Sequence, residues 1–395
     1  MAPVHVLQVT PFFPPTWAYG GIPRIVYGLG RGLTELGVKV TILTTDAMDA
    51  RSRAPVKPDR VLDGMHVLTC PNLSNRLAYD HQLFLPRGVA EALERVGRPD
   101  VVHLHGHRHL LNNFADRFAR THFAPTVLTA NGTLLRHERK QAAKVLWDLA
   151  FAGRIPQRAA RCVVVSQAER RQHLQAGLLA ERLVEIPNGL DLGEFDPLPP
   201  RGLFRRRLGI DPERPMVVYL GQLSPRKGVE HLVAAFNHQS PAGAALVVGG
   251  NDMGGGRLAR AAADPRAQVF FVGLLEGAER IQLLVDADVL VYPSTAEVFG
   301  LVPFEGLLSG TPAVVGDDCG CGELIGGAGA GLLVRHGDVA ALRDTIQRLL
   351  DHRDEARAMV DRGRRYIHEL FSWPRVASLH LRMYEEILSE GRGES

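Results

Sequence analysis

Two glutamates and a glycine lie close together in the stretch PSTAEVFGLVPFEGLLSG, residues 293–310. Glu297 and Glu305 are eight positions apart, with Gly300 between them. The pattern predicts a strand that ends before this stretch and a helix that begins just after Gly300, because Pro303 is tolerated in a first helical turn. Free N–H groups at the start of such a helix favour an anion. We therefore expect an anion site at Gly300, flanked by two carboxylates that can accept hydrogen bonds from hydroxyl groups.

The stretch LGQLSPRKG, residues 220–228, offers the opposite charge. Arg226 and Lys227 are adjacent on a loop that follows an apolar run and opens a predicted helix. An arginine fork together with a lysine point charge suits a diphosphate. An exposed basic pair is usually only solvated, but the chain has few lysines among its 46 basic residues. The position after a strand favours a binding role for this pair.

Glycines also precede the first predicted helix. Gly20 and Gly21 follow a proline-rich loop and lead into IPRIVYGLGRGLTEL, which has helical apolar spacing. Glycine lets the backbone approach a ligand closely, so both residues are candidates for contact with an anion. Arg24 lies one turn into this helix and either meets an acidic group or is an ordinary surface arginine.

Alternating histidines stand at positions 103, 105, 107 and 109. Alternate residues of a strand share one face, which could suggest a metal site. No carboxylate cluster accompanies them, so no metal is predicted here. Asp286 and Asp288 resemble a metal-binding D-x-D pair, but they precede a predicted buried strand and are interpreted as structural.

Size and composition describe a two-domain globular protein. The chain has 395 residues, 45% of them hydrophobic and 23% charged, which suits two domains of roughly 150–200 residues. The net charge of +3 is too small for a nucleic-acid-binding surface. The four cysteines form no C-x-x-C pair, which favours a reducing, cytoplasmic setting.

The elements that must position these residues are short buried strands alternating with helices. Apolar runs such as VHVLQVT, VKVTILTT, DVVHLHG, PMVVYLGQL and ADVLVYPS are typical of parallel strands covered on both faces. We predict an N-terminal domain over residues 1–187, completed by a C-terminal helix over about 373–395, and a second domain over 188–372. The proline- and glycine-rich segment around 187–213 is interpreted as the hinge. A dinucleotide-binding enzyme is disfavoured, because GLGRGL at 28–33 lacks the third glycine of that motif and falls inside a helix.

The order of these motifs resembles the family 4 retaining glycosyltransferases of the GT-B fold. The resemblance covers most of the chain and is carried by the following segments: YGGIPRIVYGLGRGLTELGVKVTILTT, DVVHLHGH, VVVSQAER, IPNGLDLGEF, YLGQLSPRKGVEHLVAAF, FVGLL and ADVLVYPSTAEVFGLVPFEGLLSGTPAVV. It implies an α/β protein with two Rossmann-like, doubly wound parallel-sheet domains that face an interdomain cleft. It also implies transfer of a hexose-type sugar from a nucleoside-diphosphate sugar to a hydroxyl acceptor, in polysaccharide, glycolipid or glycoconjugate biosynthesis.

The resemblance assigns roles to individual positions. Arg226 and Lys227 match the diphosphate ligands, and Glu297 matches the carboxylate on the transferred sugar. The remaining donor-binding positions are the glycines of the first domain, the backbone next to the base, the phosphate cradle and the ribose carboxylate: Gly20, Gly21, Leu274, Leu275, Phe299, Gly300, Leu301 and Glu305. His105 is the histidine expected to reach the sugar. Arg24 and Asn131 are expected on the acceptor side, although relatives often carry a histidine at the position of Asn131.

The expected mechanism needs no covalent nucleophile, cofactor or metal. The leaving diphosphate is stabilised by the cations and by the helix at Gly300, while the acceptor attacks from the same face. Two rival interpretations remain open: a nucleotide-sugar 2-epimerase of the same fold, and an inactive relative that only binds nucleotide sugars. Product analysis without an acceptor separates the first of these from a transferase.

One basic segment, residues 134–161, carries an apolar side. It is either an ordinary helix packed on the sheet or a helix that rests on an anionic membrane. The second interpretation suits a lipid-linked acceptor and places the protein at the inner face of the cell membrane. The expected partners are therefore a nucleotide sugar and a saccharide or lipid-linked acceptor, and no nucleic acid.

Overall fold

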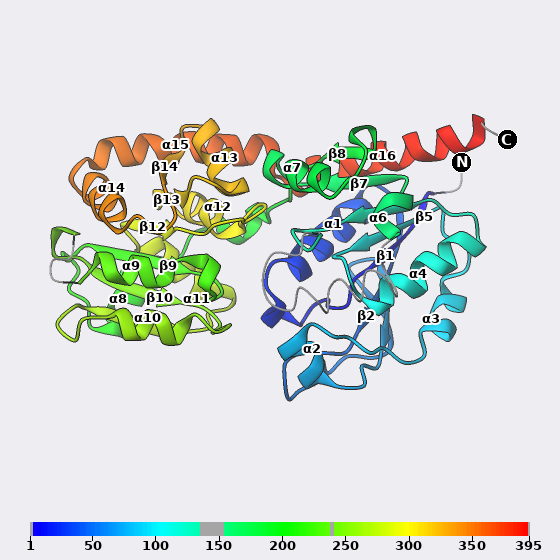
Figure 1. Ribbon diagram of the computed structural model, residues 1–395, viewed down its shortest axis with the longest axis horizontal. Helices are drawn as coiled ribbons and strands as arrows, with labels where there is room; N and C mark the ends of the chain where they lie inside the picture. The colour runs from blue at the N-terminus through cyan, green and yellow to red at the C-terminus, as the bar shows by residue number, and fades with distance from the viewer. Residues whose placement is uncertain (1–2, 135–153, 238–240, 394–395) are drawn as a thin grey trace. The chain divides into compact units, whose positions relative to one another are not determined.

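The computed structural model describes residues 3–134, 154–237 and 241–393. Contacts divide the chain into two compact units (Figure 1). Unit 1 comprises residues 1–190 and 372–395, and unit 2 comprises residues 191–371. The chain therefore passes between the units twice, and both crossings lie near the predicted domain boundaries.

Unit 1 is built around one sheet with the strand order β3-β4-β2-β1-β5-β6-β7-β8, in the part of the chain that the structure describes. Its strands are β1 His5–Val9, β2 Lys39–Thr45, β3 Asp59–Leu62, β4 Met65–Cys70, β5 Val101–His105, β6 Thr126–Thr129, β7 Arg161–Val164 and β8 Leu183–Glu185. Its helices are η1 Trp17–Tyr19, α1 Ile22–Glu35, α2 Asn75–His81, α3 Val89–Val96, α4 Leu110–Thr121, α6 Ile155–Arg158, α7 Gln167–Gln175, η3 Ala180–Arg182 and α16 Trp373–Gly393. All strand pairs are parallel except β3 with β4.

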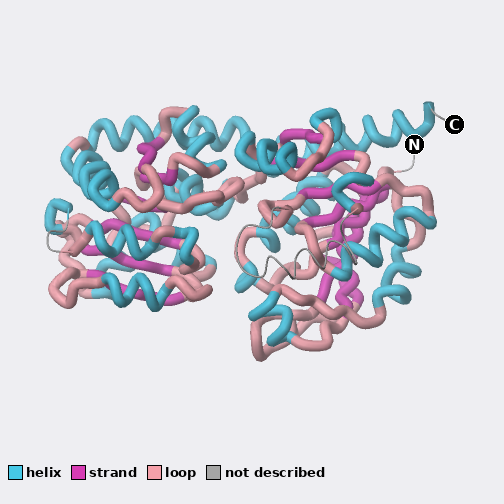
Figure 2. Tube along the Cα trace, in the orientation of Figure 1, coloured by secondary structure: helices cyan, strands magenta, loops and turns pink. Residues whose placement is uncertain are grey.

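Unit 2 holds a sheet with the order β11-β10-β9-β12-β13-β14, which is parallel throughout its described pairs. Its strands are β9 Met216–Leu220, β10 Ala245–Gly249, β11 Val269–Gly273, β12 Val289–Tyr292, β13 Ala313–Gly316 and β14 Gly331–Val334. Its helices are η4 Leu192–Phe195, α8 Leu203–Leu208, η5 Pro225–Lys227, α9 Val229–Ala235, η6 Pro241–Gly243, α10 Gly256–Ala262, α11 Gly277–Asp286, α12 Leu301–Leu308, α13 Gly320–Gly327, α14 Val339–Asp351 and α15 Arg353–Leu370. In each unit the strands lie among helices (Figure 2).

The parallel strands form where the apolar runs predict them. Every residue of β1, β5, β9 and β10 is buried, as expected for strands with helices on both faces. The sequence analysis overlooked the β3–β4 hairpin. Its turn is Asp63-Gly64, with φ of 46° and 78°, and Asp-Gly between apolar residues is a strong signal for a two-residue hairpin turn.

The glycines of GLGRGL serve helix packing in unit 1. A Cβ on Gly28 would lie 2.0 Å from Cε2 of Trp373, and one on Gly32 would lie 2.9 Å from Cβ of Ala377. Both neighbours belong to α16, which therefore packs directly on α1. The C-terminal helix α16 thus packs within unit 1, and close packing accounts for Gly28 and Gly32.

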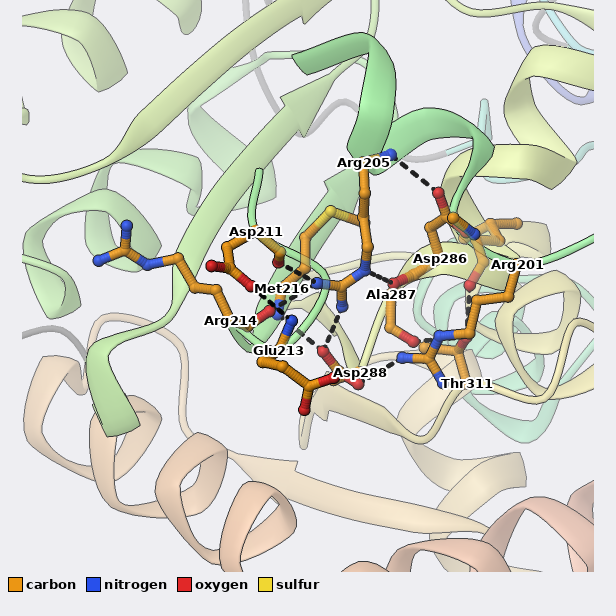
Figure 3. A network of polar contacts seen from close by, with 12 residues as sticks. Arg201, Arg205, Asp211, Glu213, Arg214, Met216, Asp286, Ala287, Asp288 and Thr311 are labelled. Carbon is orange, nitrogen blue, oxygen red and sulfur yellow. Dashed lines mark hydrogen bonds and ion pairs between the residues drawn. The ribbon is translucent and has the colours of Figure 1, made fainter. Parts of the chain in front are cut away.

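Asp286 and Asp288 have structural partners in unit 2 (Figure 3). Asp286 accepts hydrogen bonds from the backbone N–H groups of Phe204 (2.6 Å) and Arg205 (2.9 Å) at the start of α8. Asp288 pairs with Arg205 and Arg201, both at 2.5 Å. The two carboxylates hold α8 against the sheet, as the sequence interpretation proposed.

Candidate active site

Strand order explains why the charged residues of unit 2 meet. The chain runs from β9 outward to β11 and then returns to the other side of β9 with β12. Ligands of doubly wound sheets bind at such a switch point, beyond the carboxyl ends of the two central strands. Arg226 and Lys227 follow β9, and Glu297 follows β12. Since β9 and β12 are paired in parallel, their outgoing loops lie side by side.

Lys227 and Glu297 form an ion pair at this point. The Lys227 side chain is buried, and its ammonium also donates a hydrogen bond to the Tyr292 hydroxyl at 2.5 Å. The Tyr292 hydroxyl in turn donates to Glu297 Oε2 at 3.2 Å. Burial disfavours ionisation of Glu297, but Lys227, Arg226 and the Tyr292 hydroxyl together outweigh it, so the pKa of Glu297 lies below its ordinary value. The site thus holds a cation and an ionised carboxylate in a largely dry environment.

The loop that carries Glu297 is tied to the loop that carries Arg226. Thr295 N donates to the Arg226 carbonyl at 2.9 Å, and Arg226 Nη1 donates to the Ala296 carbonyl at 3.4 Å. Ala296 has a left-handed φ of 54°, which is uncommon for a residue with a Cβ. These contacts hold the guanidinium next to the Lys227–Glu297 pair.

Gly300 directly precedes α12, where the sequence predicts the helix to begin. Its φ is 71°. A Cβ at this position would approach Cys321 Sγ to 3.1 Å and Glu297 Cγ to 3.2 Å. A side chain here would be both crowded and strained, so the position favours glycine. The free N–H groups of the first turn of α12 begin beside the Glu297 loop.

Glu305 lies inside α12 and is held by an arginine that sequence analysis missed. Arg280 of α11 is buried and pairs with Glu305 Oε1 at 2.6 Å. The same guanidinium pairs with Glu194 and lies over the Phe195 ring, 5.7 Å from its centroid. Arg280 therefore links Glu305, the carboxylate predicted to bind a ribose, to the segment that enters unit 2.

The remaining predicted positions of unit 2 differ in exposure. Phe299 packs its ring against Phe304, with centroids 5.0 Å apart, so only its backbone is available for a ligand. Leu275 is buried in the core, whereas the Leu274 side chain is 49% exposed. Leu301 is the first residue of α12. Leu274 and Leu275 follow β11, two strands away from β9.

In unit 1, Gly20 and Gly21 lie where the sequence predicts, between η1 and α1. Gly20 has φ of 91°, and Gly21 is the residue before the first turn of α1. Arg24 lies in that first turn and is partly buried. Asn131 follows β6 with φ of 51°. Gly20, Gly21 and Arg24 thus follow β1 in the chain and Asn131 follows β6, all in unit 1, while Arg226, Lys227 and Glu297 belong to unit 2.

The structure places His105 among buried residues of unit 1. Its ring is 1% exposed, packs 4.2 Å from the His103 ring, and has Nε2 at 3.1 Å from Gln8 Oε1. It lines a cavity of about 10 Å³ together with Trp373 and His380, which is room for about one water molecule. Burial lowers the pKa of His105 to about 3. Contact of His105 with the transferred sugar remains a prediction.

Acid is expected to destabilise unit 1 through this histidine cluster. Burial lowers the pKa of His380 to about 4, so it stays neutral when folded, whereas an unfolded chain takes up a proton below about pH 6.5. Stability from His380 is present above pH 6.5 and is lost as the pH falls toward 4. The wild type loses unfolding free energy when the pH falls from 7 to 5. In His380→Gln, this loss should be smaller than in the wild type by about 2 kcal/mol. Denaturant titrations at both pH values measure this, and an unchanged difference would contradict it.

Three functional candidates escaped sequence analysis: Tyr292, Arg280 and Glu169. Tyr292 is the last residue of β12. The sequence feature that could have identified it is a side chain with a hydroxyl group at the carboxyl end of a buried strand. Arg280 lies on the apolar face of α11, next to Ile281 and Leu284. Glu169 lies in the first turn of α7 and is fully buried. Arg280 and Glu169 could have been identified as charged residues on otherwise buried helix faces.

The basic segment 134–161 lies mostly outside the described residues, so its contact with a membrane remains a prediction. Its described end forms α6 and the start of β7. Across residues 3–134, 154–237 and 241–393, no helix combines the length and the apolar character needed to cross a bilayer.

Comparisons with known proteins identify the family of this chain. Residues 201–366 match the family described as Glycosyl transferases group 1, and residues 19–194 match Glycosyltransferase Family 4. The D-inositol 3-phosphate glycosyltransferase of Salinispora tropica is 30% identical, over 96% of this chain and 83% of its own. The glycogen synthase of Mycobacterium tuberculosis is 26% identical, over 99% and 96%. The fold is similar to that of Anabaena Alr3699/HepE in complex with UDP-glucose, with TM-score 0.72, 19% identity, and 98% and 99% of the two chains covered.

The two family matches fall one on each unit and together cover most of the chain. Two parallel-sheet α/β units, each with a Rossmann-like strand order, confirm the predicted fold class. The chain therefore belongs to the group 1 glycosyltransferases of the GT-B fold.

Proposed function

We propose that this glycosyltransferase moves a hexose-type sugar from a nucleoside-diphosphate sugar to a hydroxyl acceptor with retention of anomeric configuration. The observation that carries the proposal is the meeting of Arg226, Lys227, Glu297 and the start of α12 at the switch point of unit 2. Cations and a helix start suit a diphosphate, and an ionised carboxylate suits sugar hydroxyls. The Anabaena relative solved with UDP-glucose supports a donor of this class.

In the proposed reaction, the bond between the anomeric carbon and the diphosphate oxygen breaks first. Arg226, Lys227 and the N–H groups of α12 stabilise the charge that develops on the leaving group. The acceptor hydroxyl attacks from the same face and gives its proton to the leaving phosphate. Glu297 orients the sugar through its hydroxyls, and Glu305 binds the ribose of the donor.

The donor-binding backbone completes the proposed site. Gly300, Leu301 and Phe299 cradle the distal phosphate and the sugar, and Leu274 and Leu275 meet the base. On unit 1 we assign Gly20 and Gly21 to the donor phosphates and Arg24 and Asn131 to the acceptor. The proposal needs no metal and no cofactor, because Arg226 and Lys227 neutralise the diphosphate charge that a metal ion would otherwise neutralise.

A panel of substrates tests the proposal. UDP-glucose, ADP-glucose and GDP-mannose serve as donors, and octyl glucoside, maltotriose and inositol phosphate serve as acceptors, with and without EDTA. We expect one donor to give a thermal shift and a glycoside whose anomeric configuration, read by NMR, matches the donor. An inverted product overturns retention, and activity abolished by EDTA overturns metal independence. A free epimerised sugar formed without any acceptor overturns transfer itself.

A further inference from the structure

A buried carboxylate holds two neighbouring loops of unit 1. Glu169 is fully buried at the start of α7. Its Oε1 accepts a hydrogen bond from Gly132 N at 2.7 Å, and its Oε2 accepts one from Val165 N at 2.9 Å. Gly132 follows β6 and Val165 follows β7, so one side chain joins the carboxyl ends of two paired strands. A carboxylate with an N–H donor on each oxygen is a tight, directional clamp.

The loop after β6 needs such a clamp because its backbone is unusual. Asn131 and Gly132 are consecutive left-handed residues, with φ of 51° and 77°. Asparagine tolerates this region better than most residues but does not prefer it. Thr133 Oγ1 donates to the Ala130 carbonyl at 2.6 Å and accepts from His107 N at 2.7 Å, which joins the same loop to the end of β5.

This loop carries a polar atom that lacks a partner. The Asn131 side-chain oxygen is buried and has no hydrogen-bond donor among the described residues. The side-chain nitrogen reaches only the Thr129 carbonyl, at 3.5 Å. Leaving a buried amide oxygen unpaired is unfavourable, and such atoms in native proteins call for an explanation. A hydroxyl group of a ligand is a donor of the required kind.

We propose that Glu169 is a positioning residue for the sugar acceptor: its ionised carboxylate holds the loop of Asn131 and Gly132 so that the Asn131 side-chain oxygen receives an acceptor hydroxyl. This inference rests on the proposed function, which assigns Asn131 to the acceptor. Protonation of Glu169 removes its negative charge and turns one oxygen into a hydroxyl, which accepts an N–H hydrogen bond much more weakly. One of the two loops is released, and the clamp opens.

The surroundings of Glu169 place this protonation near neutral pH. Burial raises the pKa of Glu169 to about 7, although the N–H groups of Val165 and Gly132 act in the other direction. The neighbouring titratable groups are neutral in this range. Burial raises the pKa of the Cys162 thiol to about 12 and lowers the pKa of His173, whose Nδ1 donates to the Glu169 carbonyl. The clamp is therefore closed above about pH 7 and open below it.

Amide hydrogen exchange tests the clamp without any substrate. In the wild type, protection of the Gly132 and Val165 amides, relative to the rates of an unstructured peptide, should rise about tenfold between pH 6 and pH 8. In Glu169→Gln, whose amide cannot accept on both sides, protection should stay low at both pH values. Glu181→Gln, which changes an exposed glutamate of the same unit, should behave as the wild type. Protection in the wild type that does not change with pH overturns the clamp.

Kinetics with the best donor and acceptor of the panel test the role of the clamp. At pH 8, Glu169→Gln should raise KM for the acceptor about tenfold while leaving KM for the donor unchanged, and the rise of kcat/KM for the acceptor between pH 6 and pH 8 should disappear. A clamp that titrates while acceptor KM is unaffected shows Glu169 to be a structural cap only, which overturns the proposal. A wild type that transfers no sugar overturns the proposed function and the acceptor role with it, whereas the exchange result still decides whether the clamp exists.

Discussion

Replacing Lys227 with methionine is expected to lower kcat about 10- to 100-fold with the donor that the panel identifies. Methionine keeps most of the apolar stem but removes the buried ammonium that pairs with Glu297 and bonds to Tyr292. A charge-assisted hydrogen bond of this kind contributes about 1.5–3 kcal/mol, which corresponds to this range of rates. Initial rates at saturating donor and acceptor measure the effect. Lys57→Met, at an exposed lysine of unit 1, is the matched control and should retain the wild-type rate.

The pair should also act as a unit. Glu297→Gln is expected to slow turnover by a similar factor, because the sugar then loses an ionised acceptor next to the cation. When both are replaced, the loss should be clearly smaller than the sum of the two single losses, since each single change already disrupts the same ion pair. Additive losses would show that Lys227 and Glu297 act independently, and a wild-type rate in Lys227→Met would remove the basis of the proposed site.

Replacing Arg280 with methionine is expected to lower the unfolding free energy of unit 2 by about 3–5 kcal/mol. Arg280 is the buried cation that compensates Glu305, whose side chain is only 4% exposed. Without it, the buried Glu305 carboxylate loses the countercharge that Arg280 supplies, and this cost exceeds that of a lost surface contact. The melting temperature of this unit should fall by roughly 10 °C. Circular dichroism or calorimetry of the full chain measures the shift.

Two further variants isolate the cause. Arg207→Met breaks the Arg207–Glu279 pair, whose side chains are 44% and 51% exposed, and should cost less than about 1 kcal/mol. Combining Arg280→Met with Glu305→Leu removes both buried charges and should recover much of the lost stability. Failure of the double variant to recover would show that the packing of Arg280 on Phe195, rather than charge compensation, is what stabilises unit 2.

Strand order made part of the candidate site predictable. The apolar runs before Pro225 and Pro293 identified β9 and β12, and a parallel sheet brings the loops after its strands to one edge. That argument predicted the neighbourhood of Lys227 and Glu297 before any distance was known. The start of α12 at Gly300 followed from a glycine next to a helical pattern.

Orientation and pairing were not predictable in the same way. Helices cover both faces of the unit 1 sheet, so alternation along β5 did not reveal that the His105 ring packs against the His103 ring and lines a cavity together with residues of α16. The partner of Glu305 depends on the packing of α11 against α12, which no local pattern specifies. The left-handed conformation of Asn131 was not predicted, although Asn-Gly is typical of such turns, and the buried acid that stabilises its loop lies far along the chain.

The split composition of unit 1 has a consequence for how the chain is made. Unit 2 is one continuous stretch, whereas unit 1 needs α16, which follows unit 2 in the sequence. As the polypeptide leaves the ribosome, unit 2 can therefore finish folding first, while the face of α1 around Gly28 waits for Trp373. The strand-like contact of Leu190 with Ser372 then joins the two points at which the chain leaves and re-enters unit 1. Synthesis begins with unit 1, but unit 2 can be the first of the two units to complete its fold.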